Sequence, residues 1–383
     1  MKTADVLEEV IRERGPLTVA AFMDLALYDP ELGYYARAVQ RSGRAGDFFT
    51  SVDVGEVFGE LLEAQIAEMA EILAGDLQPR HDFDLVEAGA GNGRLSADIL
   101  RAAHRDHPDL YNRTRLHLVE RSAAARAAQR SALAEVADRL SSSSSVELPV
   151  SFEGVLLANE LLDALPVHQV VMREEGLREV YVDRRGRTPR GDGGLVTREG
   201  PPSTPGLAEY LARLHVSLET GWRAEINLRA SAWVADAARR LRRGFLILID
   251  YGHEARQLYS VAHAAGTLTS FARHVAAAAD RSAVRPPWLL QPGEQDITAH
   301  VDFTTVRTAA EAEGLVTLGF LDQTYFLMGL HGMGPLFESL KKRLALKTLL
   351  MPGGLGSTMK VLILGKGVGA PTLRGCSYRM RVT

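Results

Sequence analysis

The pattern of apolar and polar positions predicts helices at the start of the chain and then a regular alternation of strands and helices. In residues 1–35, apolar residues recur at helical spacing in two stretches, which stop at Gly15-Pro16 and Asp29-Pro30. A longer helix is expected over 54–73. The alternation then gives strands at 83–87, 115–120 and 153–158, with helices at 94–105 and 123–139.

In the second half of the chain, a predicted β-hairpin comes first, and strands and helices then alternate again. Alternating apolar residues at 167–183 predict a β-hairpin. The run "GFLILIDYG" predicts a buried strand at 244–252, after a helix at 229–242. Helices at 303–313 and 335–350 and strands at 315–321 and 358–365 complete the chain. Apolar strands that alternate with helices predict an α/β fold with a doubly wound, mostly parallel sheet.

Three stretches do not follow this alternation. The serine run 141–145 and the Gly-, Pro- and Arg-rich stretch 184–205 are both typical of exposed loops. Residues 253–302 show no strong periodicity, and a structureless segment of that length is usually functional.

Composition narrows the classes of partner and compartment. The chain has 383 residues, of which 46% are hydrophobic and 24% charged, and its net charge is −4. This balance argues against nucleic acid or an anionic membrane as the main partner, and no apolar stretch reaches the roughly 18 residues of a membrane span. The single cysteine, Cys376, indicates a reducing compartment, and the first residues lack a targeting pattern. We therefore expect a cytoplasmic protein.

An acid and three glycines follow the first predicted strand of the alternation. "DLVEAGAGNGRLSADIL" carries Glu87 at the end of the strand, then Gly89, Gly91 and Gly93, and opens a helix. Alternating glycines permit a tight turn and a close approach of a ligand to the backbone. The spacing differs from the G-x-G-x-x-G of dinucleotide-binding proteins, because Arg94 stands at the last glycine position. Glu87 would repel a pyrophosphate but suits a sulfonium or amino group, so S-adenosylmethionine fits better than NAD.

Two further strands of the alternation also end in polar residues. Glu120 follows "RLHLV", where a carboxylate can accept hydrogen bonds from ribose hydroxyls. The strand 153–158 ends in Asn159-Glu160, and Asp163 and His168 come soon after. The competing interpretation is a structural glycine turn with surface glutamates, which the acids at neighbouring strand ends make less attractive.

The chain resembles the MidA family of S-adenosylmethionine-dependent methyltransferases, which includes the mitochondrial complex I assembly factor that methylates a protein arginine. The matching stretches run nearly from end to end, and include "LTVAAFMDLALYDPELGYY", "GDFFTS", "EAGAGNG", "ANELLDALPVHQ", "IDYG", "PGEQDITAHVDF" and "MPGGLGSTMKVL". The resemblance implies a class I, Rossmann-like methyltransferase fold. It implies a protein methyl acceptor, with a homodimer as one assembly left open.

The resemblance also implies a division of the chain and a set of site residues. Its segments would be an N-terminal helical region with a cofactor-covering loop (1–60), a cofactor-binding core (61–252), an acceptor-site insertion or lid (253–302) and a C-terminal part that completes the sheet (303–383). Asn159, Glu160 and Asp163 would border the acceptor site. S-adenosylmethionine would be bound by Gly46, Asp47, Ser51, Glu87, Gly89, Gly91, Gly93 and Glu120.

The chemistry of the acceptor decides which residues act. Carboxylates can hold a guanidinium or amine in a fork, and this role is assigned to Glu160 with Asp163 beside it. A hydroxyl or carbon acceptor needs a general base, for which His168, His274 and His300 are candidates. A small-molecule acceptor is the alternative, because the segment between His274 and Pro292 is longer than in the family. A cofactor-binding assembly factor without turnover is a second alternative, and no metal site is expected.

Overall fold

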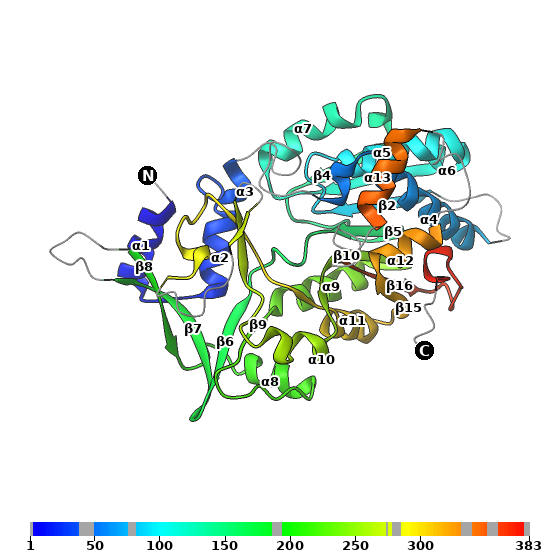
Figure 1. The fold of residues 1–383 in the computed structure, drawn as a ribbon. Helices are drawn as coiled ribbons and strands as arrows, with labels where there is room; N and C mark the ends of the chain where they lie inside the picture. Colours follow the sequence, from blue (N-terminus) through cyan, green and yellow to red (C-terminus); the bar gives the residue numbers. More distant parts are fainter. Residues whose placement is uncertain are drawn as a thin grey trace. The chain divides into compact units, whose positions relative to one another are not determined.

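The chain folds into two compact units, each built from three separate stretches of sequence (Figure 1). Unit 1 consists of residues 1–49, 162–232 and 252–306, and unit 2 consists of residues 50–161, 233–251 and 307–383. The computed structural model describes residues 3–37, 50–75, 82–185, 194–272, 275–277, 285–330, 339–350 and 359–378. The four consecutive segments expected from the sequence differ from this grouping, because residues 162–232 join unit 1 instead of the cofactor-binding core.

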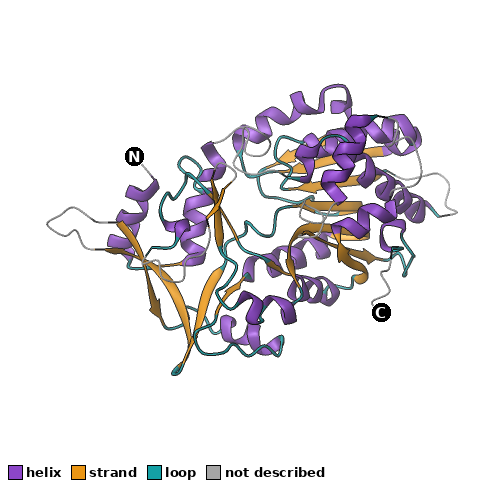
Figure 2. Ribbon diagram, viewed as in Figure 1, coloured by secondary structure: helices purple, strands orange, loops and turns teal. Residues whose placement is uncertain are grey.

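The sheet of unit 2 has the strand order β15-β16-β10-β5-β2-β3-β4. Its strands are β2 (Phe83–Ala88), β3 (Thr114–Val119), β4 (Leu140–Ser144), β5 (Phe152–Asn159), β10 (Leu241–His253), β15 (Val316–Asp322) and β16 (Met359–Lys366). The five strands from β10 to β4 are parallel, whereas β16 is antiparallel to both of its neighbours. This is the predicted α/β arrangement, and Figure 2 shows its strands flanked by helices.

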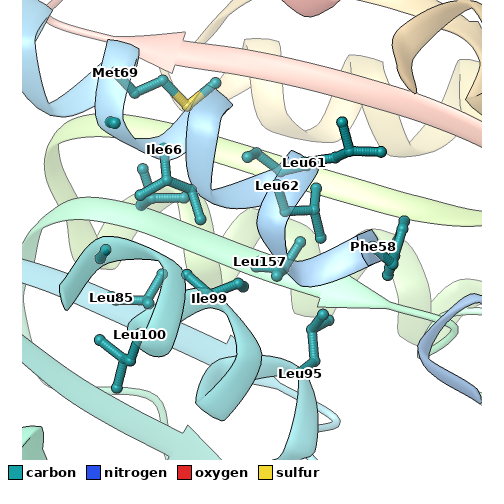
Figure 3. Packing of buried hydrophobic residues seen from close by; sticks show 14 of the residues in the cluster. Phe58, Leu61, Leu62, Ile66, Met69, Leu85, Leu95, Ile99, Leu100 and Leu157 are labelled. Carbon is teal, nitrogen blue, oxygen red and sulfur yellow. The ribbon is translucent and has the colours of Figure 1, made fainter. Parts of the chain in front are cut away.

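Helices cover this sheet because their apolar positions recur at helical spacing. They are α4 (Val57–Ala74), α5 (Arg94–Asp106), α6 (Pro108–Arg113), α7 (Ala123–Leu133), α12 (Gln323–Leu330) and α13 (Leu340–Leu350), with α9 (Leu228–Arg240) and α11 (Phe303–Ala312) shared with unit 1. Short 3₁₀ turns are η1 (Ser51–Val54), η2 (Ala134–Arg139) and η6 (Arg374–Cys376). In α4, Phe58, Leu62 and Ile66 are buried and lie with Leu85 of β2 and Leu157 of β5 in one core cluster (Figure 3). This packing fixes the strands whose ends carry the candidate site.

Unit 1 is built on an antiparallel sheet in the order β1-β7-β6-β9, with β8 paired to β7. These strands are β1 (Leu17–Thr18), β6 (His168–Arg173), β7 (Gly176–Arg185), β8 (Gly194–Gly200) and β9 (Arg223–Ile226). A smaller sheet joins β11 (Thr269–Ala272), β12 (Val275–Ala277) and β13 (Asp296–Thr298), and β14 (Val301–Asp302) pairs with the end of β10. The helical elements are α1 (Thr3–Arg14), α2 (Val19–Tyr28), α3 (Tyr34–Arg37), α8 (Gly206–Arg213), α10 (Ala255–Leu258), η3 (Val261–His263) and η4 (Pro287–Leu289).

Two local predictions are wrong in this structure, those for the serine run and for the stretch 184–205. The serine run is not a loop, because it forms edge strand β4, whose backbone pairs with β3. Its side chains are largely exposed, and Ser142 and Ser143 bond to His117 and Gln129. The stretch 184–205 contains β8, whose backbone pairs with β7 from Glu179 to Arg185. Residues 253–302 contain short helices and the three-stranded sheet, which are too short to give a periodic signal. Among the described residues, no helix is long and apolar enough to cross a membrane.

Candidate functional site

The candidate site lies in unit 2, at the carboxyl ends of its parallel strands. The strand β2 has β3 on one side and β5 on the other, so the strand order reverses next to it. In doubly wound sheets, ligands bind at this kind of switch point. Each of the four strands that meet there ends in or near an acidic residue, namely Glu87, Glu120, Glu160 and Asp250.

The glycine loop after β2 has the open, tightly turned form that the sequence predicts. Gly89, Gly91 and Gly93 all have positive φ angles, between 52° and 81°. The amides of Gly89 and Ala90 both donate to the carbonyl oxygen of Val119, so the loop is fixed to the end of β3. A Cβ placed on Gly91 would meet no atom of the described residues within 4 Å. The backbone at Gly91 is therefore free to approach a ligand.

Glu120 connects this loop to the next helix. Its carboxylate accepts hydrogen bonds from the amide of Gly91 at 2.9 Å and from the amide of Ser122 at 2.7 Å. Each carboxylate oxygen has two lone pairs, so each can accept one more bond. Glu120 can thus hold the loop and a pair of ligand hydroxyls together.

Glu87 is a buried carboxyl group that is already hydrogen-bonded within the protein. It lies on buried β2 and accepts hydrogen bonds from the amide and the hydroxyl of Ser96, in the first turn of α5. Burial, and then the nearby carboxylates of Glu120 and Asp98, raise the pKa of Glu87 to about 7, although the bonds from Ser96 oppose this. At neutral pH, Glu87 is therefore poised between its charged and neutral forms.

Asn159 and Glu160 lie side by side after β5. Glu160 has a φ of 52°, a left-handed conformation that is uncommon for a residue other than glycine and that clusters at functional sites. The side-chain amide of Asn159 donates to Glu160 at 3.2 Å. The other polar atom of Asn159, Oδ1, is buried and has no hydrogen-bond partner in the described part of the chain. A buried acceptor without a donor next to a carboxylate suits a ligand that carries N–H groups.

The environment of Glu160 disfavours its charged form. The residue keeps partial access to solvent, yet protein closely surrounds its carboxyl group. This burial, and next the carboxylate of Asp250, raise the pKa of Glu160 to about 8, with a smaller contribution from Asp53. The group therefore gains from a positively charged ligand and can also accept a proton near neutral pH.

Asp250 and Asp53 were missed by the sequence reasoning. Asp250 is buried, and its carboxylate accepts from the amide of Leu161 at 3.1 Å, while the amide of Glu160 donates to the carbonyl of Ile249. These bonds hold the turn of Glu160 against β10. A signal was present for Asp250, because it follows the apolar run "FLILI" as Glu120 follows its own strand.

Ser51 lies at the site, because its backbone amide is hydrogen-bonded to the carboxyl group of Glu160, while its buried hydroxyl contacts the side chain of Gln323. The remaining predicted residues lie in unit 1 or are not described. Asp163 and His168 belong to unit 1, so they are not in the same unit as Glu160. His168 lies 2.8 Å from the buried carboxylate of Glu179 across β6 and β7, which gives it a structural partner. Gly46, Asp47 and His274 lie outside the described residues.

The strand ends fit the cofactor that the sequence predicts. The open face at Gly91 admits a ligand, Glu120 offers acceptors for hydroxyls, and Glu87 gains from a nearby positive charge. A nucleoside with a cationic side chain meets all three conditions. A pyrophosphate would meet the repulsion of the two carboxylates.

Known proteins share this chain's sequence and fold. Residues 61–321 match the family model described as "Putative S-adenosyl-L-methionine-dependent methyltransferase". The chain is 32% identical over 340 residues to the mitochondrial protein arginine methyltransferase NDUFAF7 of Mus musculus, with 83% of this chain and 71% of that protein covered. The Drosophila melanogaster homologue is 27% identical, with 97% and 86% covered. A Burkholderia thailandensis protein crystallised with S-adenosyl-homocysteine is 28% identical, with a TM-score of 0.84 over 98% of this chain and 94% of that one.

These comparisons correct one prediction and establish the cofactor. The expected cytoplasmic location is contradicted, since the curated relatives are mitochondrial proteins. A low cysteine count indicates only a reducing compartment and does not distinguish the cytoplasm from an organelle. The cofactor is S-adenosyl-L-methionine. The chain belongs to the MidA family of S-adenosyl-L-methionine-dependent methyltransferases.

Proposed function

We propose that this enzyme methylates the guanidinium group of a protein arginine, and that Asn159 and Glu160 hold that group. The observation that carries the proposal is the pair itself, a carboxyl with a raised pKa next to a buried amide oxygen that lacks a donor among the described residues. A guanidinium presents five N–H donors in a plane and a positive charge. It therefore satisfies the unpaired oxygen and relieves the electrostatic cost at Glu160 together.

The activity of two relatives supports the same acceptor. The mouse and human relatives are protein arginine methyltransferases, and the human protein is 30% identical to this chain, with 83% of the chain covered. The assignment of residues 253–302 to acceptor recognition and the homodimer stay predictions.

The residues of the glycine loop and the neighbouring strand ends are proposed to hold the cofactor. Gly89, Gly91 and Gly93 would shape the pocket, Glu120 would accept the ribose hydroxyls, and Glu87 would face the cationic side. Bound S-adenosyl-L-methionine supplies an electrophilic methyl group on its sulfonium. The protein's contribution is alignment in a site with little water, an effect that can reach about 7–11 kcal/mol.

Glu160 would act on the acceptor nitrogen in two ways. Its carboxylate can accept N–H bonds from the guanidinium and so fix one nitrogen, with its lone pair localised, in line with the methyl carbon. The nitrogen loses a proton as it gains the methyl group. The carboxylate form of Glu160, whose pKa is about 8, can accept that proton and become the neutral carboxyl, and Oδ1 of Asn159 would accept another N–H of the guanidinium.

The test is transfer of a labelled methyl group by the full chain to a panel of acceptors. We expect label on arginine in peptides and on none of the matched lysine peptides, as read by mass spectrometry of the modified residue. Label on a metabolite but not on a peptide would favour the small-molecule alternative. Cofactor binding without any transfer, to lysates as well as to peptides, would favour an assembly factor without turnover.

Glu120→Ala is expected to weaken binding of S-adenosyl-L-methionine by about 1–3 kcal/mol, the order for loss of hydrogen bonds to a charged group. The loss has two sources, since Glu120 also accepts the amide of Gly91. Titration calorimetry measures it. Glu120→Gln, which keeps one acceptor oxygen, should lose less, and Glu147→Ala on the exposed surface should lose nothing. An unchanged affinity in Glu120→Ala would remove this residue from the cofactor site.

A further inference from the structure

Three histidines from separate segments of unit 1 lie together. His253 is the last residue of β10, His263 is the last residue of η3, and His300 precedes β14. One ring nitrogen from each lies within 4.8 Å of the other two. The ring centroids are 4.8 to 5.8 Å apart, and all three residues are partly buried. We name this group the histidine cluster.

The backbone around the histidine cluster is well fixed. The end of β10 pairs with β14, so His253 is the register partner of Asp302 and lies beside the segment of His300. The amide of His300 donates to the hydroxyl of Thr267 at 3.0 Å. The amide of Thr267 in turn donates to Glu225 at 2.7 Å. The cluster is therefore built on paired strands and a hydrogen-bonded loop, as a preorganised site requires.

The ring of His263 is held as the ring of a metal-binding histidine usually is. Nδ1 of His263 lies 3.0 Å from the carbonyl oxygen of Gln257, and because a carbonyl can only accept, Nδ1 carries the proton. The lone pair of His263 is then on Nε2. In metal-binding histidines, the ring nitrogen that does not bind the metal usually donates a hydrogen bond to a carbonyl oxygen or carboxylate, and this bond orients the ring. Nδ1 of His300 is buried and has no hydrogen-bond partner in the part of the chain that the structure describes.

The carboxylate of Asp302, the register partner of His253, is engaged by other donors. It accepts from the hydroxyls of Tyr210 and Thr305 and from the amide of Thr304. It serves as the N-terminal cap of α11. Three neighbouring imidazoles would repel one another if they were charged, so an arrangement of neutral rings that share a cation is the more favourable explanation.

We propose that His253, His263 and His300 bind a divalent transition metal, with zinc as the first choice. Three neutral imidazoles are a preferred ligand set of Zn²⁺, and Co²⁺ takes the same ligands. In a tetrahedral site, Zn–N distances near 2.0–2.1 Å place the nitrogens roughly 3.4 Å apart. The nitrogens now lie within 4.8 Å of one another, so the side chains would have to rotate toward one another when the metal binds. The metal would join the end of β10, η3 and the loop before β14, and its fourth position would be left to water or another ligand.

The experiment is metal binding to the full chain after removal of metals with a chelator. We expect one equivalent of Zn²⁺ in competition titrations with a chelating dye, and a Co²⁺ complex with the visible absorption of a tetrahedral site. His263→Ala and His300→Ala should each weaken Zn²⁺ binding by at least about 100-fold, more than the loss of an outer hydrogen bond costs. The matched control is His104→Ala, an exposed histidine of α5, which should bind as the parent does.

Two outcomes would overturn the proposal. One is the absence of stoichiometric binding of Zn²⁺ and Co²⁺ in the parent chain. The other is binding that survives unchanged in both variants, which would place the metal elsewhere. Circular dichroism and S-adenosyl-L-methionine binding check that each variant is folded. If His300→Ala is not folded, the more conservative His300→Asn replaces it in the titrations. These readouts do not depend on the acceptor, so their failure would leave the proposed arginine methylation untouched.

Discussion

Glu160→Gln is expected to lose about 10²–10³-fold in the rate of methyl transfer while it binds S-adenosyl-L-methionine as tightly as the parent. The range is the usual cost of removing one group that stabilises charge in a transition state. Glutamine keeps the size of the side chain and its place after β5 but has no charge to pair with a guanidinium. It also cannot accept the proton that the nitrogen loses. Single-turnover transfer to an arginine peptide and calorimetry with the cofactor measure the two quantities.

The pH dependence adds a second readout to this variant. Because the pKa of Glu160 is raised to about 8, the carboxyl is mostly protonated at pH 6–7 and charged above pH 8. The parent's kcat/KM should therefore rise as pH increases through about 8, and the variant should lack this rise. Glu153→Gln, at the opposite end of β5, is the matched control and should behave as the parent. A loss of cofactor affinity equal to the loss of transfer would contradict the assignment of Glu160 to the acceptor.

Glu87→Gln is expected to stabilise the protein without cofactor above pH 7, by up to about 3 kcal/mol. The carboxyl of Glu87 keeps its proton up to about pH 7 in the folded chain, whereas the unfolded chain releases it near pH 4.5. The folded state thus binds more protons between these values, and the free energy of unfolding falls as pH rises through this window. Glutamine resembles the protonated acid and avoids that loss. In denaturant unfolding, the parent and Glu87→Gln should have about equal free energies of unfolding at pH 5, and the variant should be more stable at pH 8.

The same variant should bind the positively charged cofactor less tightly. We propose that the carboxylate of Glu87 attracts the cationic part of S-adenosyl-L-methionine, and that this attraction offsets the cost of burying the charge. Replacing Glu87 by the neutral glutamine should therefore reduce the affinity for the cofactor at pH 8. The product, S-adenosyl-homocysteine, lacks the sulfonium charge, so its binding should be less affected. Glu71→Gln, on the exposed surface of α4, should change neither stability nor binding. Greater stability with an unchanged affinity for both ligands would make Glu87 a structural residue only.

The sequence predicted the sheet of unit 2 well because its strands are continuous apolar runs. "GFLILIDYG" and "EGVLLAN" are short apolar runs between predicted helices, which is typical of buried strands, and they form β10 and β5. The serine strand β4 could not be predicted in this way. Its place depends on backbone pairing with β3, and its side chains carry no apolar signal. The helix α12 was missed because it begins at the residue directly after β15, so no loop residues mark the boundary between them.

The candidate site was predictable only where strand ends mark it. Glu87, Glu120 and Glu160 each follow an apolar run, and the structure places them at one edge of the sheet of unit 2. The left-handed backbone of Glu160 and its repulsion by Asp250 depend on packing between β5 and β10, which no local pattern encodes. The histidine cluster draws on positions 253, 263 and 300, a spacing that matches no metal-binding motif.

The position of β16 sets the order in which unit 2 can be completed during synthesis. This strand, Met359–Lys366, lies between β10 and β15, although both of these precede it in the chain. Until the ribosome releases β16, the facing edges of β10 and β15 cannot be joined through it. In nascent chains, the edges of β10 and β15 should therefore stay unpaired until late in synthesis. Such open strand edges favour aggregation or the binding of chaperones.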